Sequence, residues 1–290
     1  MPVLIDLFLW LGPHLGIGQV TRPSMNTLAS LLTGSGFKSE DVSNFVKLYQ
    51  QFNLLGIVRT FPIGVFSLMS GKNPLLSPLG LPVTYQVDSP DHLVEILFLL
   101  TLAGWIIGAL YFRSVAALVT KELLPNRGRA IVQTFLYSLI WSVLLWGFGI
   151  PLLLFIYFFF MLNPYVGEAV LLILGFLSMW LIVPVFFSPL GIFIKKQNAL
   201  ASIIGSFRMT RYTLPAGSLF VLIVIGFGVG LNILWAIPDD NSWVVAVGIL
   251  GHAFIMTALL ASTFAYYRDI TAWLQTVLGR LRAAVPVQPG

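Results

Sequence analysis

Five long apolar runs limit the fold of this chain more than any other feature of its sequence. A helix that crosses about 30 Å of hydrocarbon needs roughly 20 mostly apolar residues, and each run meets this length. The runs predict an all-α fold, a polytopic integral membrane helical bundle. They cover residues 92–112, 130–162, 169–194, 214–238 and 243–267.

The composition agrees with this class and excludes several others. Hydrophobic residues make up 58% of the chain and charged residues only 9%, whereas an ordinary soluble domain has roughly 25% charged residues. The chain has no cysteine, which excludes disulfides, thiolate metal sites and cysteine nucleophiles. The basic residues flank apolar runs and form no separate polar domain, so we expect no nucleic-acid partner.

The basic residues predict an orientation in the membrane. Eleven of the sixteen Lys and Arg residues lie within residues 113–129, 195–211 and 268–282. Loops on the cytoplasmic side are enriched in Lys and Arg, so all three stretches should lie on that side. This requires residues 130–162 to form one helix, kinked at Pro151. The pattern predicts a plasma or inner membrane protein with six transmembrane helices and both termini in the cytoplasm.

The N-terminal 91 residues are expected to form two regions. Residues 1–19 form the first transmembrane helix, and residues 20–91 form an external helical insertion that precedes a five-helix transmembrane core, residues 92–267. Within the insertion, residues 52–69 are apolar but contain Arg59 and Pro62, which favours an interfacial or re-entrant helix over a further span.

A second helix is predicted earlier in the insertion. Val42, Phe45, Val46 and Tyr49 recur at helical spacing after Ser39, which is a favourable N-cap residue. This spacing places the four apolar side chains on one face of an amphipathic helix.

Two segments on the cytoplasmic side are predicted to be amphipathic helices in the inner interface: residues 198–212, and residues 270–281 within the C-terminal region 268–290. Their partners are expected to be membrane lipids, anionic ones above all, or other membrane-protein subunits. The residues predicted to make these contacts are Lys195, Lys196, Arg208, Arg211, Trp273, Arg280 and Arg282.

Two histidines are candidate cofactor ligands. His252 lies in the outer half of the last apolar run beside the small residues Gly248 and Gly251, which would let a haem or chlorin approach its imidazole. His14 would lie in the same half of the membrane and could complete a bis-histidine site. The simpler interpretation, which we favour, is that His252 is hydrogen-bonded inside the bundle and that the chain holds no cofactor.

Asp6 is the carboxylate predicted to lie deepest in the membrane, and no Lys or Arg lies within the predicted spans to pair with it. Buried ionisable groups in membranes are costly and often functional, so Asp6 is a candidate ion- or proton-coupling residue. It could instead be protonated, bonded to another helix or close to the inner interface. No metal site is predicted. Gly104 and Gly108, like the glycines of residues 226–230, are predicted to allow close helix packing.

Residues 188–222 have the sequence SPLGIFIKKQNALASIIGSFRMTRYTLPAGSLFVL, in which Ser202, Ser206 and Thr210 recur at four-residue spacing. This segment resembles an element of uncharacterised six-span bacterial membrane proteins, including the membrane domain attached to some glycerophosphodiester phosphodiesterases. The resemblance covers residues 98–273 and implies a helical, lipid-associated membrane module with no catalytic residue. The long N-terminal insertion and the lack of a phosphodiesterase domain depart from that family.

The sequence favours a non-catalytic scaffold or subunit that binds lipid or partner membrane proteins. A transporter or permease component is the first alternative, and a pigment- or haem-binding subunit is the second. We expect no enzymatic activity, because the chain has no nucleotide-binding loop, metalloprotease helix or serine-hydrolase motif.

Overall fold

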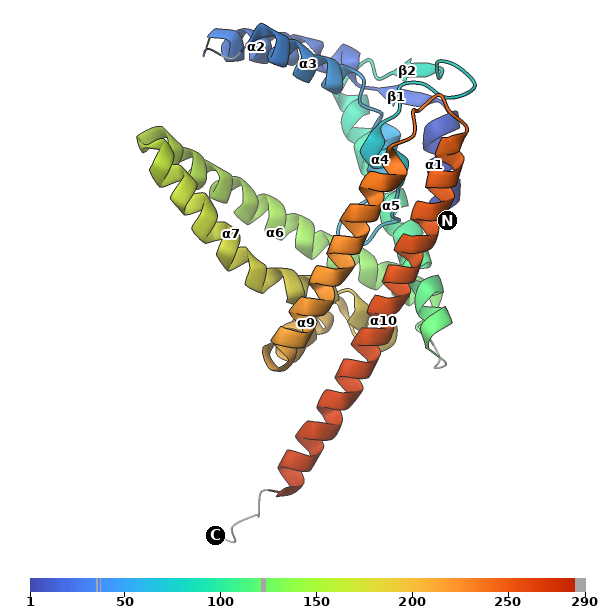
Figure 1. Ribbon diagram of the computed structural model, residues 1–290, viewed down its shortest axis with the longest axis vertical. Helices are drawn as coiled ribbons and strands as arrows, with labels where there is room; N and C mark the ends of the chain where they lie inside the picture. The colour runs from blue at the N-terminus through green and yellow to red at the C-terminus, as the bar shows by residue number, and fades with distance from the viewer. Residues whose placement is uncertain (35, 37, 121–123, 285–290) are drawn as a thin grey trace. The chain divides into compact units, whose positions relative to one another are not determined.

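The computed structural model describes residues 1–34, 36, 38–120 and 124–284, and almost all of its regular structure is helical (Figure 1). The side chains at 48–50, 179 and 282–284 lie outside the described part. The chain forms two compact units. The first joins Met1–Gly108 to Gly228–Met256, and the second joins Ala109–Phe227 to Thr257–Gly290.

Among the described residues, four helices are long and apolar enough to cross a membrane. A fifth span is formed if the segments Pro164–Ser178 and Trp180–Ile194, which meet at a 40° bend, are counted as one crossing. These segments contain α7 (Pro164–Phe187) and α8 (Leu190–Ile194). The structure thus has four to five candidate spans where six were predicted. The four long helices are α5 (Pro90–Val119), α6 (Arg127–Leu162), α9 (Ala199–Ala236) and α10 (Val244–Ala284).

The difference lies at the N-terminus. Helix α1 covers only Pro2–Leu11, and ten residues at 1.5 Å each extend about 15 Å, roughly half of the hydrocarbon thickness. The helix ends because Gly12 adopts an extended conformation before Pro13, and a residue before proline is disfavoured in the helical region. Strand β1 (His14–Gly16) follows and pairs in parallel with β2 (Thr84–Gln86), so residues 1–19 do not form one long helix.

The predicted insertion is helical at its start. Helices α2 (Gly18–Gly34) and α3 (Ser39–Gln50) lie side by side (Figure 1). The start of α3 at Ser39 confirms the predicted helix, and Val42 on it is buried.

The single helix predicted over residues 52–69 is wrong. This segment contains a 3-10 turn, η1 (Leu54–Val58), then irregular backbone, then the short helix α4 (Leu68–Lys72). Pro62 interrupts the helical pattern because it has no backbone N–H, and the Phe61–Pro62 peptide is cis.

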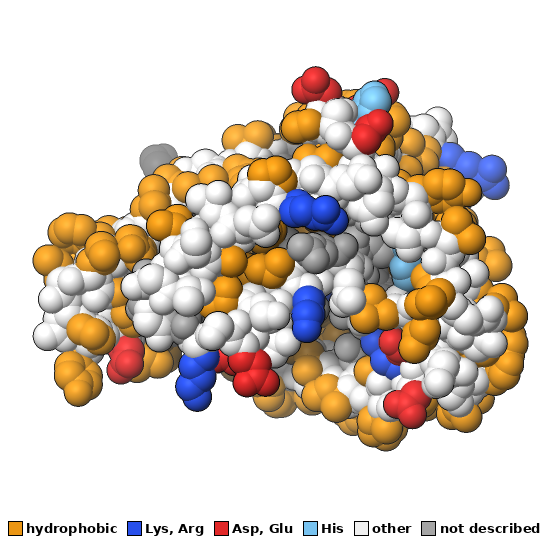
Figure 2. Space-filling model, turned by 90° about the horizontal axis from the view of Figure 1, so that it is seen from above, with side chains coloured by type: hydrophobic (Ala, Val, Ile, Leu, Met, Phe, Trp, Pro, Cys, Tyr) orange, Lys and Arg blue, Asp and Glu red, His pale blue; other side chains and the backbone are white. Residues whose placement is uncertain are grey.

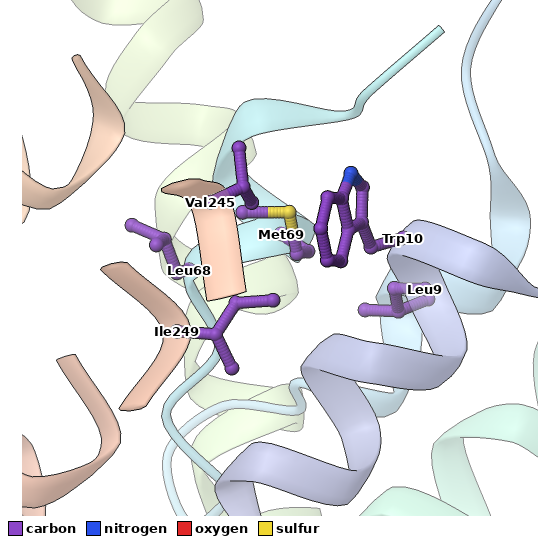
Figure 3. Packing of buried hydrophobic residues seen from close by; sticks show 6 residues of the cluster. All are labelled: Leu9, Trp10, Leu68, Met69, Val245 and Ile249. Carbon is purple, nitrogen blue, oxygen red and sulfur yellow. The ribbon is translucent and has the colours of Figure 1, made fainter. Parts of the chain in front are cut away.

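The first unit has a hydrophobic cluster built from three helices. Leu9 and Trp10 come from α1, Leu68 and Met69 from α4, and Val245 and Ile249 from α10 (Figure 3). All six side chains are at most 3% exposed. Burying a large apolar side chain stabilises a fold by about 1.5–3 kcal/mol, so this cluster fixes the short helices α1 and α4 onto α10.

In the second unit, α6 is one continuous helix through Pro151, as predicted, and it pairs with α7 in a helical hairpin (Figure 1). The amphipathic segment 198–212 and the following span are one helix, α9, with non-helical dihedral angles at Thr213. Pro215 explains this break, since its ring conflicts with the carbonyl of residue 211.

The amphipathic helix predicted at residues 270–281 is the continuation of α10 and not a separate interfacial element. No glycine or proline lies between residues 267 and 270 to end the helix. On the face shown in Figure 2, charged side chains are few and hydrophobic ones are abundant. An exposed surface of this kind suits a chain whose solvent is largely lipid.

Candidate functional site

Asp6 on α1 is fully buried in the first unit and accepts three hydrogen bonds. The Ser67 hydroxyl donates to Oδ1 at 2.5 Å, the Met69 amide donates to Oδ1 at 3.0 Å, and the Leu68 amide donates to Oδ2 at 3.1 Å. Both amides belong to the first turn of α4, where a helix has no internal acceptors for its N–H groups. Asp6 therefore joins α1 to α4 by satisfying donors that would otherwise be buried without partners.

His252 on α10 completes the polar cluster. Its Nδ1 atom lies 3.9 Å from Oδ2 of Asp6, and the two side chains are 5% and 0% exposed. Within the described part of the chain, this Nδ1 has no hydrogen-bond partner, since 3.9 Å is too long for a hydrogen bond. Asp6 and His252, which are separate candidates in the sequence analysis, are thus neighbours in the structure. The alternative that Asp6 is bonded to another helix is confirmed, and that helix is α4.

A second set of polar contacts links the same helices near the α9–α10 turn. Lys72, the last residue of α4, forms a 2.6 Å salt bridge with Asp240 and donates a hydrogen bond to the Pro238 carbonyl. Trp10 donates from Nε1 to the Asp240 carbonyl at 2.8 Å, and its ring meets Trp243 edge-on at 5.7 Å. Polar contacts therefore hold α1 and α4 at two places: at Asp6, and at the α9–α10 turn.

Sequence reasoning missed three members of these two clusters: Ser67, Lys72 and Asp240. The role of Ser67 could have been predicted from the sequence, because serine is a common N-cap residue; its hydroxyl accepts a hydrogen bond from the Ser70 amide at 3.0 Å. The ion pair of Lys72 with Asp240 could not have been predicted, because it depends on how distant segments of the chain meet.

Irregular backbone packs against the middle of α5. A Cβ atom added to Gly104 would lie 2.7 Å from the Val58 carbonyl oxygen, and one added to Gly108 would lie 2.9 Å from both Gly64 Cα and the Ile63 carbonyl oxygen. Backbone packs closely at Gly104 and Gly108, but the partner is a loop and not the helix that was predicted, and Gly226 and Gly230 have no described atom within 4 Å of an added Cβ. Irregular backbone is tolerated at membrane depth only where protein or water covers it, and α5 supplies such cover.

His14 lies on β1, and its side chain is buried. Burial lowers the pKa of His14, and a hydrogen bond to the Leu9 carbonyl opposes that effect. Its backbone amide donates to the Val83 carbonyl at 2.9 Å. His14 and His252 thus each face their own neighbours, and among the described residues no hydrogen bond or ion pair joins them.

Trp235 lies against Gly248 and Gly251, the two small neighbours of His252. A Cβ atom at Gly251 would lie 2.7 Å from the Trp235 ring, and one at Gly248 would lie 2.7 Å from its carbonyl oxygen. The described residues also contain no group of three or more His, Asp or Glu that could hold a metal ion.

Several of the predicted lipid-contact residues make contacts within the second unit. Lys195 ends α8 with its ammonium group 5.6 Å from the centre of the Tyr267 ring, and burial lowers its pKa. The Lys196 carbonyl accepts a 2.8 Å hydrogen bond from Arg129. Trp273 is 54% exposed. The side chains of Arg208, Arg211 and Arg280 are exposed, whereas that of Arg282 lies outside the described part.

The serines of residues 188–222 have a structural role at the end of α7. Ser202 and Ser206 are fully buried on one face of α9. Ser202 donates to the Ser188 carbonyl, and Ser206 donates to the Pro184 carbonyl at 2.6 Å. The last carbonyls of a helix have no intrahelical partner, so these hydroxyls cap α7 from a neighbouring helix.

No protein-family model, curated protein or solved structure matches the chain. What the protein does is therefore inferred from its own residues.

Proposed function

We propose that the chain is a non-catalytic integral membrane protein, a scaffold or subunit that binds lipid and partner membrane helices. The observation that carries this proposal is the uncovered hairpin of α6 and α7. Among the described residues at 141–180, only Gly167 is buried, and its backbone lies against the ring of Phe160. Both helices of the hairpin are apolar around their circumference, so their outer faces suit lipid or the helices of another protein.

The hairpin also carries aromatic residues and open glycines. Gly147 and Gly175 have no described atom within 4 Å of the position that a Cβ would occupy. Small residues on a membrane helix allow the backbone of a second helix to approach closely. Large exposed aromatic side chains lie on the same two helices: Trp146, Phe148, Phe176 and Trp180.

The proposal includes an orientation in a plasma or inner membrane. With the bent segments Pro164–Ser178 and Trp180–Ile194 counted as one crossing, five spans still put residues 113–129, 195–211 and 268–282 on one side of the membrane. The excess of Lys and Arg in these stretches identifies it as the cytoplasmic side. The segment before α5 then lies outside, as predicted for residues 20–91. Helix α1 is too short to return the N-terminus to the cytoplasm by itself, so only the C-terminus is proposed to lie there.

The test is to extract the full chain from its native membranes in polymer-bounded lipid discs and to identify what co-purifies by native mass spectrometry. The double variant Gly147→Leu/Gly175→Leu, with Gly279→Leu as a control, probes the hairpin. We expect the wild type and the control to retain the same lipid or membrane protein and the double variant to lose it. A monomer that carries neither, or an unchanged set of partners in the double variant, would overturn the proposal.

A transporter component is the second candidate, and the Asp6–His252 pair near irregular backbone is the observation that favours it. Transport sites often combine broken helices with buried ionisable groups. The substitutions Asp6→Asn and His252→Ala should then abolish a flux measured in reconstituted vesicles. If both variants keep the full flux, this candidate loses its basis.

A further inference from the structure

The Asp6–His252 pair has a geometry that goes beyond a structural link. Among the described residues, Oδ1 of Asp6 accepts two hydrogen bonds, whereas Oδ2 accepts only that of Leu68. A carboxylate oxygen can accept two, so Oδ2 has capacity left on the side of His252. Nδ1 of His252 is buried and has no hydrogen-bond partner in this same part of the chain. An acceptor with spare capacity and an unsatisfied ring nitrogen therefore face each other across 3.9 Å.

A single proton between these atoms would resolve the mismatch. A buried carboxylate without a compensating cation is costly, and a buried imidazole nitrogen without a partner also costs free energy. When the pair takes one proton from water, it becomes either carboxylate with imidazolium or carboxylic acid with imidazole. The pair is neutral in both forms, and one N–H or O–H donor then points at the opposite atom. A rotation of the imidazole that shortens the separation by about 1 Å would give a charge-assisted hydrogen bond.

We propose that Asp6 and His252 form a proton-binding site that holds one shared proton and thereby fastens α10 to α1 and α4. The proton belongs to the pair, as expected for two strongly coupled groups. Since α1 supplies the carboxylate, α4 orients it and α10 supplies the imidazole, loss of the proton leaves an ionised carboxylate buried where the three helices meet.

The other ionisable residues of the first unit do not offer an alternative site for this proton. Arg59 lies beside Gly71, and its positive charge acts on both Asp6 and His252, where it opposes the binding of a proton and cannot promote it. Lys72 is paired with Asp240 at the α9–α10 turn. His14 has its own partner in the Leu9 carbonyl, and His92 is exposed in a 2.9 Å pair with Asp88.

The sign of the pH dependence follows from linkage. The folded pair holds a proton that the same groups release in the unfolded chain once the pH exceeds the ordinary range of histidine, about 6.5. A state that binds more protons gains stability as the pH falls. The folded chain should therefore lose stability as the pH rises above neutrality. Replacing the side chain of Asp6 or of His252 should make this pH-dependent loss of stability smaller.

The experiment measures thermal unfolding of the full chain in lipid nanodiscs between pH 5.5 and 8.5. The wild type should lose at least about 3 °C of melting temperature across this range, equivalent to about 1 kcal/mol for a chain of this size. His252→Gln and Asp6→Asn should flatten the profile. His92→Gln is the matched control, because it removes an exposed histidine–aspartate pair, and it should keep the wild-type profile.

A second readout needs no variant of Asp6, whose substitution could prevent folding. The chain has only three histidines, so ¹⁵N-histidine NMR in nanodiscs, with His14→Gln and His92→Gln for assignment, resolves His252. At pH 7 its two ring nitrogens should show either an imidazolium or a neutral ring whose Nδ1 accepts a strong hydrogen bond, and the signals should change as the site releases its proton. An Nδ1 signal typical of a free imidazole nitrogen throughout, or a His252→Gln profile equal to the wild type, would overturn the proposal.

Discussion

The α1–α4–α10 cluster and the α6–α7 hairpin are both made of apolar residues, but the chain covers them very differently. Side chains such as Trp10 and Ile249 are at most 1% exposed, whereas Trp146 on the hairpin is 68% exposed. The covered region also holds a carboxylate with three donors, whereas the buried polar contacts of the hairpin lie at its base, where Tyr137 is bonded to Ser188 and Ser206 to the Pro184 carbonyl. In lipid, apolar character alone gives helices little reason to associate, so specific hydrogen bonds and close packing decide which surfaces meet.

The largest predicted effect on stability is that of replacing Asp6. Asp6→Ala leaves one hydroxyl and two amides buried without an acceptor, which should cost about 3–5 kcal/mol of unfolding free energy. Thermal and chemical unfolding in detergent micelles would measure the loss. Asp239→Ala changes an exposed acid of the same unit and should stay within about 0.5 kcal/mol of the wild type. Equal effects of the two substitutions would remove the distinction between the regions.

The second prediction compares the same substitution in a filled and in an open position. Gly108→Ala places a methyl group 2.9 Å from backbone atoms of the loop and should destabilise by about 1–3 kcal/mol. Gly147→Ala meets no described atom within 4 Å and should be neutral or stabilising by up to about 1 kcal/mol, because alanine favours helix over glycine. Unfolding of both variants in the same micelles tests this. A stable Gly108→Ala would show that the loop does not pack against α5.

The third and smallest predicted effect on stability concerns the hydrogen bond between Trp10 and the Asp240 carbonyl. Trp10→Phe keeps most of the buried ring and removes the N–H that donates to the Asp240 carbonyl at 2.8 Å. The expected cost is about 1 kcal/mol, the usual net value of one hydrogen bond. Limited proteolysis at the α9–α10 turn should become faster, whereas Trp146→Phe should leave both readouts unchanged. A loss above about 3 kcal/mol would instead indicate that the shape of the indole ring matters more than its hydrogen bond.

The sequence was sufficient for the membrane class, the long helices and the single helix through Pro151, because apolar length is a local property. It failed where a few residues decided local structure, as with Gly12 and Pro13 after α1 and the irregular backbone around Pro62. It named both Asp6 and His252 as candidates, since ionisable residues stand out in apolar runs. Their proximity could not be predicted, because it depends on the contact between α1, α4 and α10.

Fluorescence quenching by lipids brominated on their acyl chains tests the contrast between the two regions most directly. The protein would be reconstituted in such lipids, and the quenched intensity of the wild type compared with that of Trp146→Phe and Trp10→Phe. We predict that Trp146→Phe removes part of the quenchable emission, because Trp146 is 68% exposed, and that Trp10→Phe leaves it unchanged, because Trp10 is 1% exposed. Unchanged quenching in Trp146→Phe together with reduced quenching in Trp10→Phe would contradict this account.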